Sequence, residues 1–195
     1  MQIKNEEAND AERITLIQFA AFDGHPIHAG AEATEHLIVE RLRAEGALSL
    51  SLIAEENGEA VGHIAMSSAT VGKHTTGWFL LGPVGVIPSR QRNGIGSALI
   101  REALQCMKEN GAEGIVLVGD PDYYHRFGFK SFPDLSYAGV PNQYVLGLSF
   151  TECTPEGEIV AHDAFRNPTK KVEAHPDKNE PSRRVHHYLS INNGK

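Results

Sequence analysis

Residues 81–88 read LGPVGVIP, and residues 91–99, which follow almost at once, read QRNGIGSAL. The apolar run predicts a buried strand, and the glycine-punctuated run predicts the start of a helix. The first turn of a helix leaves backbone N–H groups without intrachain partners and carries the positive end of the peptide dipole, so it binds anions. Gly94 and Gly96 lack the β-carbons that would keep a phosphate away from those amides. This junction, with two arginines beside it, therefore predicts a phosphate-binding site.

The spacing of the glycines excludes the two commonest phosphate motifs. No Lys-Ser or Lys-Thr pair follows them, as a nucleotide P-loop requires, and no third glycine completes a dinucleotide fingerprint. ATP and NAD are therefore poor candidates for the ligand.

Two motifs carry a resemblance to a known family. Gln91-x-x-Gly94-x-Gly96 resembles the acetyl-CoA signature of the GCN5-related N-acetyltransferases (GNAT), and residues 124–129, YHRFGF, look like the family's Tyr-x-x-x-Gly-Phe element. The resemblance covers about residues 12–165, and residues 119–124 and 157–165 look most like a YhbS-type branch of predicted acetyltransferases. It implies an α/β fold of the GNAT, or acyl-CoA N-acyltransferase, type, with a mixed, mostly antiparallel sheet and helices on both faces.

The resemblance also implies where acetyl-CoA, the co-substrate, would bind. The diphosphate cradle would consist of Gln91, Arg92, Asn93, Gly94, Ile95, Gly96 and Ser97. In the family, the preceding strand parts from its neighbour near a bulge, and the freed backbone groups bond the pantetheine arm and the acyl oxygen. The corresponding residues here are Val84, Gly85 and Val86, and Pro83, which has no N–H, agrees with interrupted pairing. The alternative is an ordinary buried strand that Pro83 kinks.

Tyr124 stands where the family places the tyrosine that protonates the departing CoA sulfur. A phenol with a reference pKa of about 10 stays protonated at neutral pH and can donate to a thiolate. Tyr123 is the second candidate, and a core tyrosine without a catalytic role is the alternative for Tyr124.

The general base that would deprotonate the amine carries no motif. Glu55, His63 and Asp122 qualify by residue type alone, and His63 reads better as a hydrogen-bonded core histidine. No metal site is predicted, because the two cysteines, Cys106 and Cys153, form no metal-type pair.

Local signals predict the order of elements. Asp10 would cap a helix to about residue 22, and a second helix would cover 32–45. A hairpin over 48–55 and 60–68 would turn at Asn57-Gly58. Then come a strand over 78–87, a helix over 94–110, a strand over 115–118, a short helix capped by Asp120, and strands over 129–132 and 143–150.

Composition indicates a single domain over 1–165, followed by a basic, weakly structured C-terminal tail over 166–195. The domain has 11 Lys or Arg against 22 Asp or Glu, a net charge of −11, whereas the tail has seven against three, or +4. No apolar run approaches the roughly 20 residues that cross a bilayer, and the polar first residues do not look like a signal peptide, so we expect a cytoplasmic protein without a membrane partner.

The acidic domain argues against nucleic acid as a partner and mildly favours a cationic acceptor. The expected acceptor is a small-molecule amine or a protein amine; a homodimer is compatible with the sequence. The predicted reaction is direct N-acetyl transfer in a ternary complex, since the sequence shows no Ser or Cys with a base partner. The alternative is a non-catalytic acyl-CoA-binding or regulatory module on the same fold.

Overall fold

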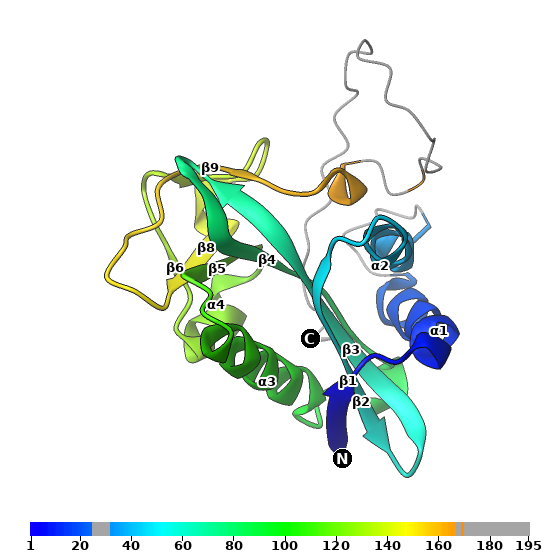
Figure 1. Ribbon diagram of the computed structural model, residues 1–195. Helices are drawn as coiled ribbons and strands as arrows, with labels where there is room; N and C mark the ends of the chain where they lie inside the picture. Colours follow the sequence, from blue (N-terminus) through cyan, green and yellow to red (C-terminus); the bar gives the residue numbers. More distant parts are fainter. Residues whose placement is uncertain (25–31, 167–168, 170–195) are drawn as a thin grey trace.

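The computed structural model describes residues 1–24, 32–166 and 169. Within them, strands and helices form a layered α/β domain (Figure 1). The strands are β1 (Gln2–Asn5), β2 (Leu48–Glu56), β3 (Glu59–Val71), β4 (His74–Val86), β5 (Gly114–Val118), β6 (Lys130–Ser131), β7 (Leu135–Ser136), β8 (Val145–Ser149) and β9 (Gly157–Val160). The helices are α1 (Ala11–Phe22), α2 (Glu35–Ala44), α3 (Ile95–Glu109) and α4 (Pro121–Tyr124).

The sheet runs in the order β1-β2-β3-β4-β5-β8-β6, and β9 adds to the far end of β3 while pairing with β7. Its pairs are antiparallel except β4 with β5 and β7 with β9. Figure 1 shows α1 and α2 on one face of the sheet and α3 and α4 on the other. The mixed, mostly antiparallel sheet with helices on both faces is thus confirmed.

The apolar periodicity of α3 fixes how this helix packs. Ile95, Leu99, Ala103 and Met107 are all buried and join the residues of β2 to β5 in one hydrophobic cluster. Because these positions recur at one-turn intervals, one stripe of the helix faces the sheet. Packing of this stripe holds the amino end of α3 beside the end of β4.

The β2–β3 hairpin turns where its sequence predicts. Asn57 and Gly58 have φ angles of 53° and 82°, the left-handed conformation that a two-residue hairpin turn of this twist requires. The turn sets the register between β2 and β3.

β4 parts from β5 halfway along its length. The two strands pair only over Trp78–Leu80 and Gly114–Val116, although β4 continues to Val86. On its other side, β4 has a register irregularity against β3, where the partners change from Leu81–Met66 to Val84–Ile64. Gly82 and Pro83 lie within this irregularity, so the interrupted pairing expected around Pro83 is present. A wedge therefore opens between β4 and β5 at the end nearest α3.

Several local expectations need correction. Asp10 precedes α1, but its buried carboxylate accepts a hydrogen bond from the Glu7 N–H (3.1 Å) and pairs with Arg13 (2.6 Å) instead of capping α1. The second helix begins at Glu35, three residues later than expected. β1, β7 and β9 were not expected. The predicted tail lies outside the described residues, except for Arg166 and Thr169.

Candidate active site

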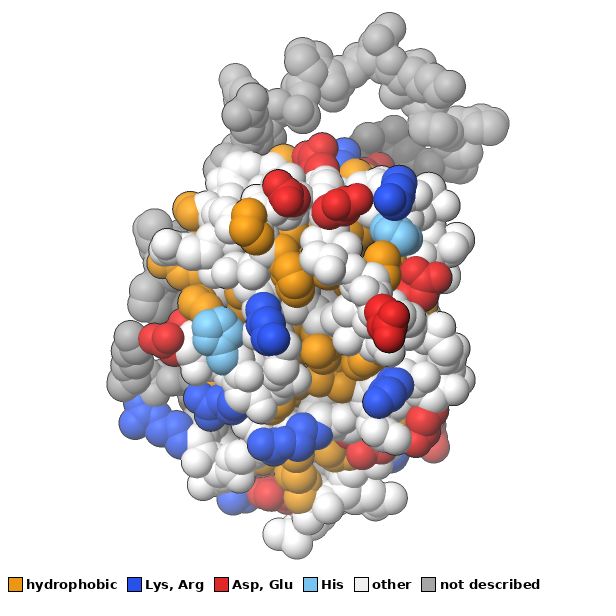
Figure 2. Space-filling model, turned by 90° about the vertical axis from the view of Figure 1, so that its left-hand side faces the viewer, with side chains coloured by type: hydrophobic (Ala, Val, Ile, Leu, Met, Phe, Trp, Pro, Cys, Tyr) orange, Lys and Arg blue, Asp and Glu red, His pale blue; other side chains and the backbone are white. Residues whose placement is uncertain are grey.

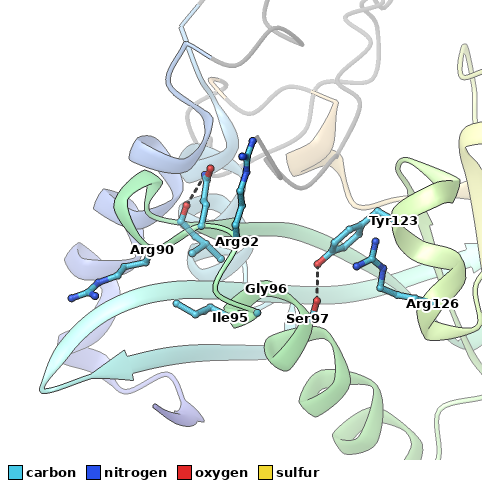
Figure 3. Close-up of a pocket in the computed structure, with 10 residues that line it drawn as sticks. Arg90, Arg92, Ile95, Gly96, Ser97, Tyr123 and Arg126 are labelled. Atoms are coloured by element: carbon cyan, nitrogen blue, oxygen red, sulfur yellow. Dashed lines mark hydrogen bonds between the residues drawn. The ribbon is translucent and has the colours of Figure 1, made fainter. Parts of the chain in front are cut away.

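A cavity of about 290 Å³ opens at the junction between β4 and α3 (Figure 3). Three segments contribute to it: the end of β4, the loop with the first turn of α3, and α4 with the turn that follows. The lining residues are Val86, Arg90, Gln91, Arg92, Gly94, Ile95, Gly96, Ser97, Tyr123 and Arg126. Seven of the ten residues predicted to bind acetyl-CoA line this cavity, namely Val86, Gln91, Arg92, Gly94, Ile95, Gly96 and Ser97. The other three, Val84, Gly85 and Asn93, do not.

The loop before α3 is held in a conformation that favours glycine. Arg92 and Gly94 have φ angles of 63° and 82°. The side-chain amide of Gln91 donates to the Val86 carbonyl (3.0 Å), and that of Asn93 donates to the Arg90 carbonyl (3.3 Å). Gln91 thus fastens the loop to the end of β4. The residues of the first turn of α3 line the cavity, and their backbone N–H groups have no intrahelical acceptors.

Tyr123 and Arg126 close the cavity on the α4 side. The Tyr123 hydroxyl lies 3.3 Å from Ser97 Oγ, and the Arg126 guanidinium stacks over the Tyr123 ring at 4.6 Å from its centroid. A β-carbon on Gly96 would lie 3.5 Å from the Tyr123 hydroxyl, an ordinary van der Waals contact, so the glycine leaves room there for a ligand atom. From the sequence, Tyr123 was expected only as a second proton donor, and Arg126 was not expected at the site. The signal was available, since residues three apart on a helical turn share a face.

Positive charge gathers at this cavity although residues 1–165 carry a net charge of −11. Arg90, Arg92 and Arg126 all line it. Figure 2, which views the molecule from the side of α3 and α4, shows several Lys and Arg side chains on the lower half of this face, with hydrophobic side chains visible between them. An anionic ligand would therefore meet both backbone donors and guanidinium groups.

Tyr124, the predicted proton donor, lies next to Tyr123 but does not line the cavity. It is 2% exposed, its ring meets those of Tyr123 and Phe129 edge-on at 5.2 and 5.8 Å, and it packs against the backbone of Gly119. Burial, together with the neighbouring Tyr123, raises the pKa of Tyr124 far above the ordinary value for a phenol. The hydroxyl is therefore protonated throughout the neutral range. Tyr124 belongs to the same hydrophobic cluster as Val84 and Val86, beside the wedge.

Gly85, in the middle of the predicted acyl-binding strand, is covered from the α1 face. A β-carbon on Gly85 would lie 2.8 Å from Gln18 Oε1 and 3.0 Å from the Ala21 methyl group. The absence of a side chain thus lets α1 approach β4 closely.

The three candidate bases do not line the cavity. Glu55 pairs with Arg13 (2.7 Å) and Lys4 (3.3 Å), and these partners lower its pKa, chiefly the hydrogen bond from Arg13. Asp122 is exposed on α4. A group that binds its proton weakly, as Glu55 does, is a poor base.

His63 is a core histidine, as interpreted from the sequence. Its ring is fully buried between the amide of Gln18, which donates to Nδ1 (2.7 Å), and the Ser51 hydroxyl, which lies 2.9 Å from Nε2. Burial, reinforced by the charge of Arg43 and opposed by that of Glu6, lowers the pKa of His63 to about 3. The ring is therefore neutral at pH 7 and holds α1 against the sheet.

Within the described ranges, no group of three or more His, Cys, Asp or Glu side chains is arranged to hold a metal ion. The helices in the same ranges are all too short or too polar to cross a membrane.

The fold and the cavity can be compared with known proteins. Residues 12–129 match the family model of the acetyltransferase (GNAT) family. A crystal structure of a GNAT family acetyltransferase from Brucella melitensis in complex with acetyl-CoA superposes with a TM-score of 0.73 at 43% identity, covering 84% of this chain and 97% of that one. The chain therefore belongs to the GNAT family of acetyltransferases.

Individual relatives agree with this assignment. The uncharacterized N-acetyltransferase YhbS of Escherichia coli is 33% identical over 131 residues, which is 67% of this chain and 74% of YhbS. A crystal structure of YhbS in complex with CoA has a TM-score of 0.76 and covers 84% of this chain and 91% of that one. The uncharacterized N-acetyltransferase YjhQ is 30% identical over 150 residues, 75% of this chain and 78% of YjhQ. The resemblance to the YhbS branch is thus confirmed.

Proposed function

We propose that this protein is a cytoplasmic N-acetyltransferase that moves the acetyl group of acetyl-CoA directly to a primary amine in a ternary complex. The cavity at the start of α3 is the observation that carries the proposal. It combines the free amides of the helix start, the room that Gly96 leaves and three arginines, which together fit a diphosphate. The 43% identical Brucella protein, crystallised with acetyl-CoA, supports the same ligand here.

The proposal gives each part of the site one task. Residues 91–97 hold the diphosphate, and the Tyr123 hydroxyl with Arg126 closes the cradle from the α4 side. Val84–Val86 pair with β3 but lie beyond the point where β4 parts from β5, and on the side away from β3 their backbone offers hydrogen bonds to the pantetheine arm and to the acyl oxygen. Acetyl-CoA supplies the activated acyl group, which as a thioester needs no covalent enzyme intermediate.

Tyr124 is the proposed proton donor to the departing thiolate. Its raised pKa keeps the proton on the hydroxyl until a strongly basic group forms beside it. Its membership of the same hydrophobic cluster as Val84 supports this role. No residue is assigned as the general base, because Glu55 and His63 bind a proton weakly and nothing in the structure assigns Asp122 to the site.

The first experiment is calorimetric titration of acetyl-CoA into the wild type and into a Gly94→Glu, Gly96→Glu double variant. Two carboxylates at the helix start would repel a diphosphate and fill the space that it needs, so binding should be lost. Gly111→Glu is the matched control, because Gly111 lies just beyond the other end of α3, has a similar φ of 80° and also has open space around it. This control should bind acetyl-CoA as the wild type does.

Release of CoA thiol in the presence of a panel of amines completes the test. Binding together with amine-dependent release supports the transferase. Binding without release on any amine would instead indicate a non-catalytic acyl-CoA-binding module. If the wild type does not bind acetyl-CoA, or if the double variant binds it unchanged, the proposed cradle is wrong.

A further inference from the structure

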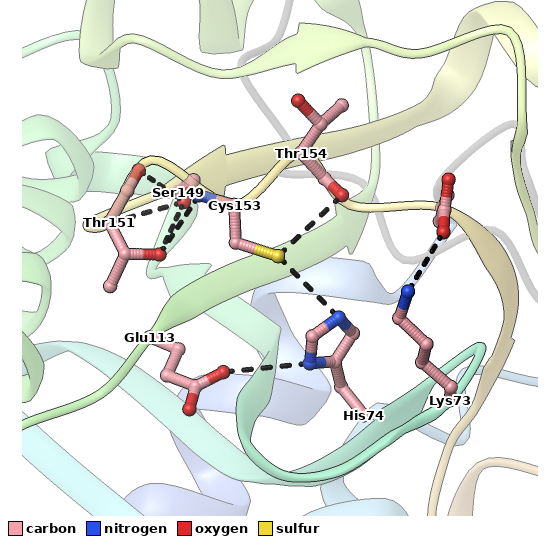
Figure 4. A network of polar contacts seen from close by, with 8 residues as sticks. Lys73, His74, Glu113, Ser149, Thr151, Cys153 and Thr154 are labelled. Carbon is pink, nitrogen blue, oxygen red and sulfur yellow. Dashed lines mark hydrogen bonds and ion pairs between the residues drawn. The ribbon is translucent and has the colours of Figure 1, made fainter.

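A second group of reactive side chains lies at the opposite end of β4 from the cavity (Figure 4). His74 is the first residue of β4, and Val86 is the last. A strand of this length spans on the order of 40 Å. Cys153 lies in the loop between β8 and β9, and Glu113 directly precedes β5. The group is thus separate from the proposed acetyl-CoA site.

His74 contacts both of the other side chains. Cys153 Sγ lies 3.5 Å from His74 Nε2, and Glu113 Oε2 lies 3.7 Å from His74 Nδ1. A thiol, an imidazole and a carboxylate in this order match the arrangement in which a base activates a nucleophile and an acid orients the base. All three side chains are accessible to solvent in part, so a small reagent can reach the sulfur.

The backbone holds these groups in place. The Glu113 N–H donates to the Gly77 carbonyl (2.7 Å), and a β-carbon on Gly77 would lie 2.8 Å from the Glu113 carboxyl carbon. Gly77, whose φ of 81° also favours glycine, therefore lets the carboxylate lie across the start of β4 toward His74. The Cys153 N–H donates to Thr151 Oγ1 (3.2 Å), which fixes the turn that carries the thiol.

Cys106, the other cysteine of the sequence, offers a contrast. It lies on α3, where burial and the charges of Glu102 and Glu109 raise the pKa of its thiol. Cys106 has two carboxylates for neighbours, whereas Cys153 has an imidazole. The two thiols should therefore differ in reactivity within one molecule.

We propose that Cys153 is a reactive thiol, activated by His74 and Glu113, that forms mixed disulfides with low-molecular-weight disulfides. The Cys153 thiol gives its proton to His74 Nε2, and the imidazolium that results is stabilised by the Glu113 carboxylate. The thiolate attacks one sulfur of the disulfide, a new S–S bond forms as the old one breaks, and one thiolate leaves. The leaving thiolate takes the proton from His74. Cysteine is oxidised, the leaving half of the disulfide is reduced, and no other reactant is needed.

The test uses the full chain with Cys106→Ser, so that Cys153 is its sole cysteine, and neutral 4,4′-dithiodipyridine as the disulfide. The rate of thiopyridone release at pH 7 is compared between the folded protein and the same protein unfolded in urea. An ordinary cysteine is a thiolate in only about 3% of molecules at this pH, so activation leaves room for an increase of about tenfold. We expect the folded protein to react about tenfold faster.

Two variants separate activation from simple exposure. His74→Gln removes the base and should lower the rate to that of the unfolded chain. Glu113→Gln keeps His74 as the base and should lower the rate about threefold. The pH profile should also change: from pH 7 to 9 the rate should rise only slightly with His74 present and steeply in His74→Gln. Charged groups lie on both sides of His74. Glu113 contacts its ring, and the neighbouring Lys73 forms an ion pair with Glu156 (3.5 Å).

A folded rate at or below the unfolded rate would overturn the proposal. So would an unchanged rate and pH profile in His74→Gln or in Glu113→Gln, each checked for its melting temperature. Saturating acetyl-CoA should not protect Cys153, since the two sites lie at opposite ends of β4. The result is therefore independent of the proposed acetyl transfer.

Discussion

Tyr123 and Tyr124 are neighbours in the chain with opposite surroundings. The Tyr123 hydroxyl reaches Ser97 at the cavity, whereas Tyr124 is buried among aromatic rings. Because α4 turns its successive residues by about 100°, two adjacent identical side chains point in different directions. Their chemical tasks should differ accordingly, with Tyr123 serving binding and Tyr124 serving proton transfer.

Substitution of Tyr124 by Phe tests this division. Phe keeps the aromatic packing and removes only the acid, so kcat should fall about a hundredfold, the lower end for loss of a general acid, while the Kd for acetyl-CoA stays within about twofold. Steady-state kinetics and calorimetry measure the two quantities.

Tyr123→Phe is the control beside it. This variant should weaken acetyl-CoA binding a few-fold with little effect on kcat, since one hydrogen bond contributes about 1 kcal/mol. If Tyr123→Phe instead abolishes turnover and Tyr124→Phe does not, the roles are reversed.

At the scale of the elements, a glycine of α3 and a glycine of β5 should respond differently to replacement by Ala. Gly96 lies in the first turn of α3, where an added β-carbon meets nothing closer than 3.5 Å. Ala is also the better helix former by about 1 kcal/mol. Gly96→Ala should therefore keep or raise the melting temperature, yet weaken acetyl-CoA binding because the methyl group enters the cavity.

Gly114→Ala is the matched change in β5. Its β-carbon would lie 2.3 Å from the Trp78 ring, which is fully buried, so the core must shift. Such overpacking costs about 1–3 kcal/mol, which thermal unfolding would detect. Equal melting temperatures for the two variants would contradict the packing described for β5.

Most of the elements that were predicted correctly depend on residues close together in the chain. Asn57-Gly58 defines its own turn, Asp120 accepts a hydrogen bond from the Asp122 N–H (3.0 Å) as the cap of α4, and the stripe of α3 lies within the helix itself. The residues predicted for the cradle are contiguous in the chain, so most of them line one cavity.

Features that depend on distant partners could not be predicted. β1 and β9 have only four residues each, and their pairing with β2 and β3 supplies what their sequences do not. Cys153 and His74 are 79 residues apart in the chain, so no spacing rule links them. The sequence therefore showed no cysteine with a base partner, although the fold provides one.

At the scale of the whole molecule, His63 should make stability depend on pH. Burial lowers its pKa to about 3 in the folded protein, against about 6.5 in the unfolded chain. Between these values the unfolded chain binds the additional proton, so stability falls as pH drops below 6.5. The loss should be about 2 kcal/mol between pH 7.5 and pH 5.

Urea unfolding of wild type and His63→Asn measures this loss. Asn keeps a polar group beside Gln18 and does not titrate, so its stability should change by about 2 kcal/mol less over the same pH range. The other titrating groups contribute equally to the pH dependence of both proteins. If the free energy of unfolding of the two proteins depended on pH in the same way, His63 would not titrate as described.

The net charge of the domain leads to an expectation about the acceptor. An overall charge of −11 over residues 1–165 attracts cations and repels anions at low ionic strength. Cationic small amines should therefore give higher kcat/KM than neutral or acidic ones, and added salt should reduce the difference. A panel in which acidic amino acids are the better acceptors would contradict this expectation.

The position of β8 indicates that the cooperative folding unit extends beyond residue 129. β8 lies between β5 and β6 in the sheet and covers β5 along all five of its residues, although it follows the region 12–129 that the family model matches. A fragment of that region alone would leave β5 as a bare hydrophobic edge, a surface prone to aggregation. During synthesis, β5 likewise cannot pair with the whole of β8 until residue 149 has been made. The part of the chain by which the family is recognised is thus smaller than the part that can fold.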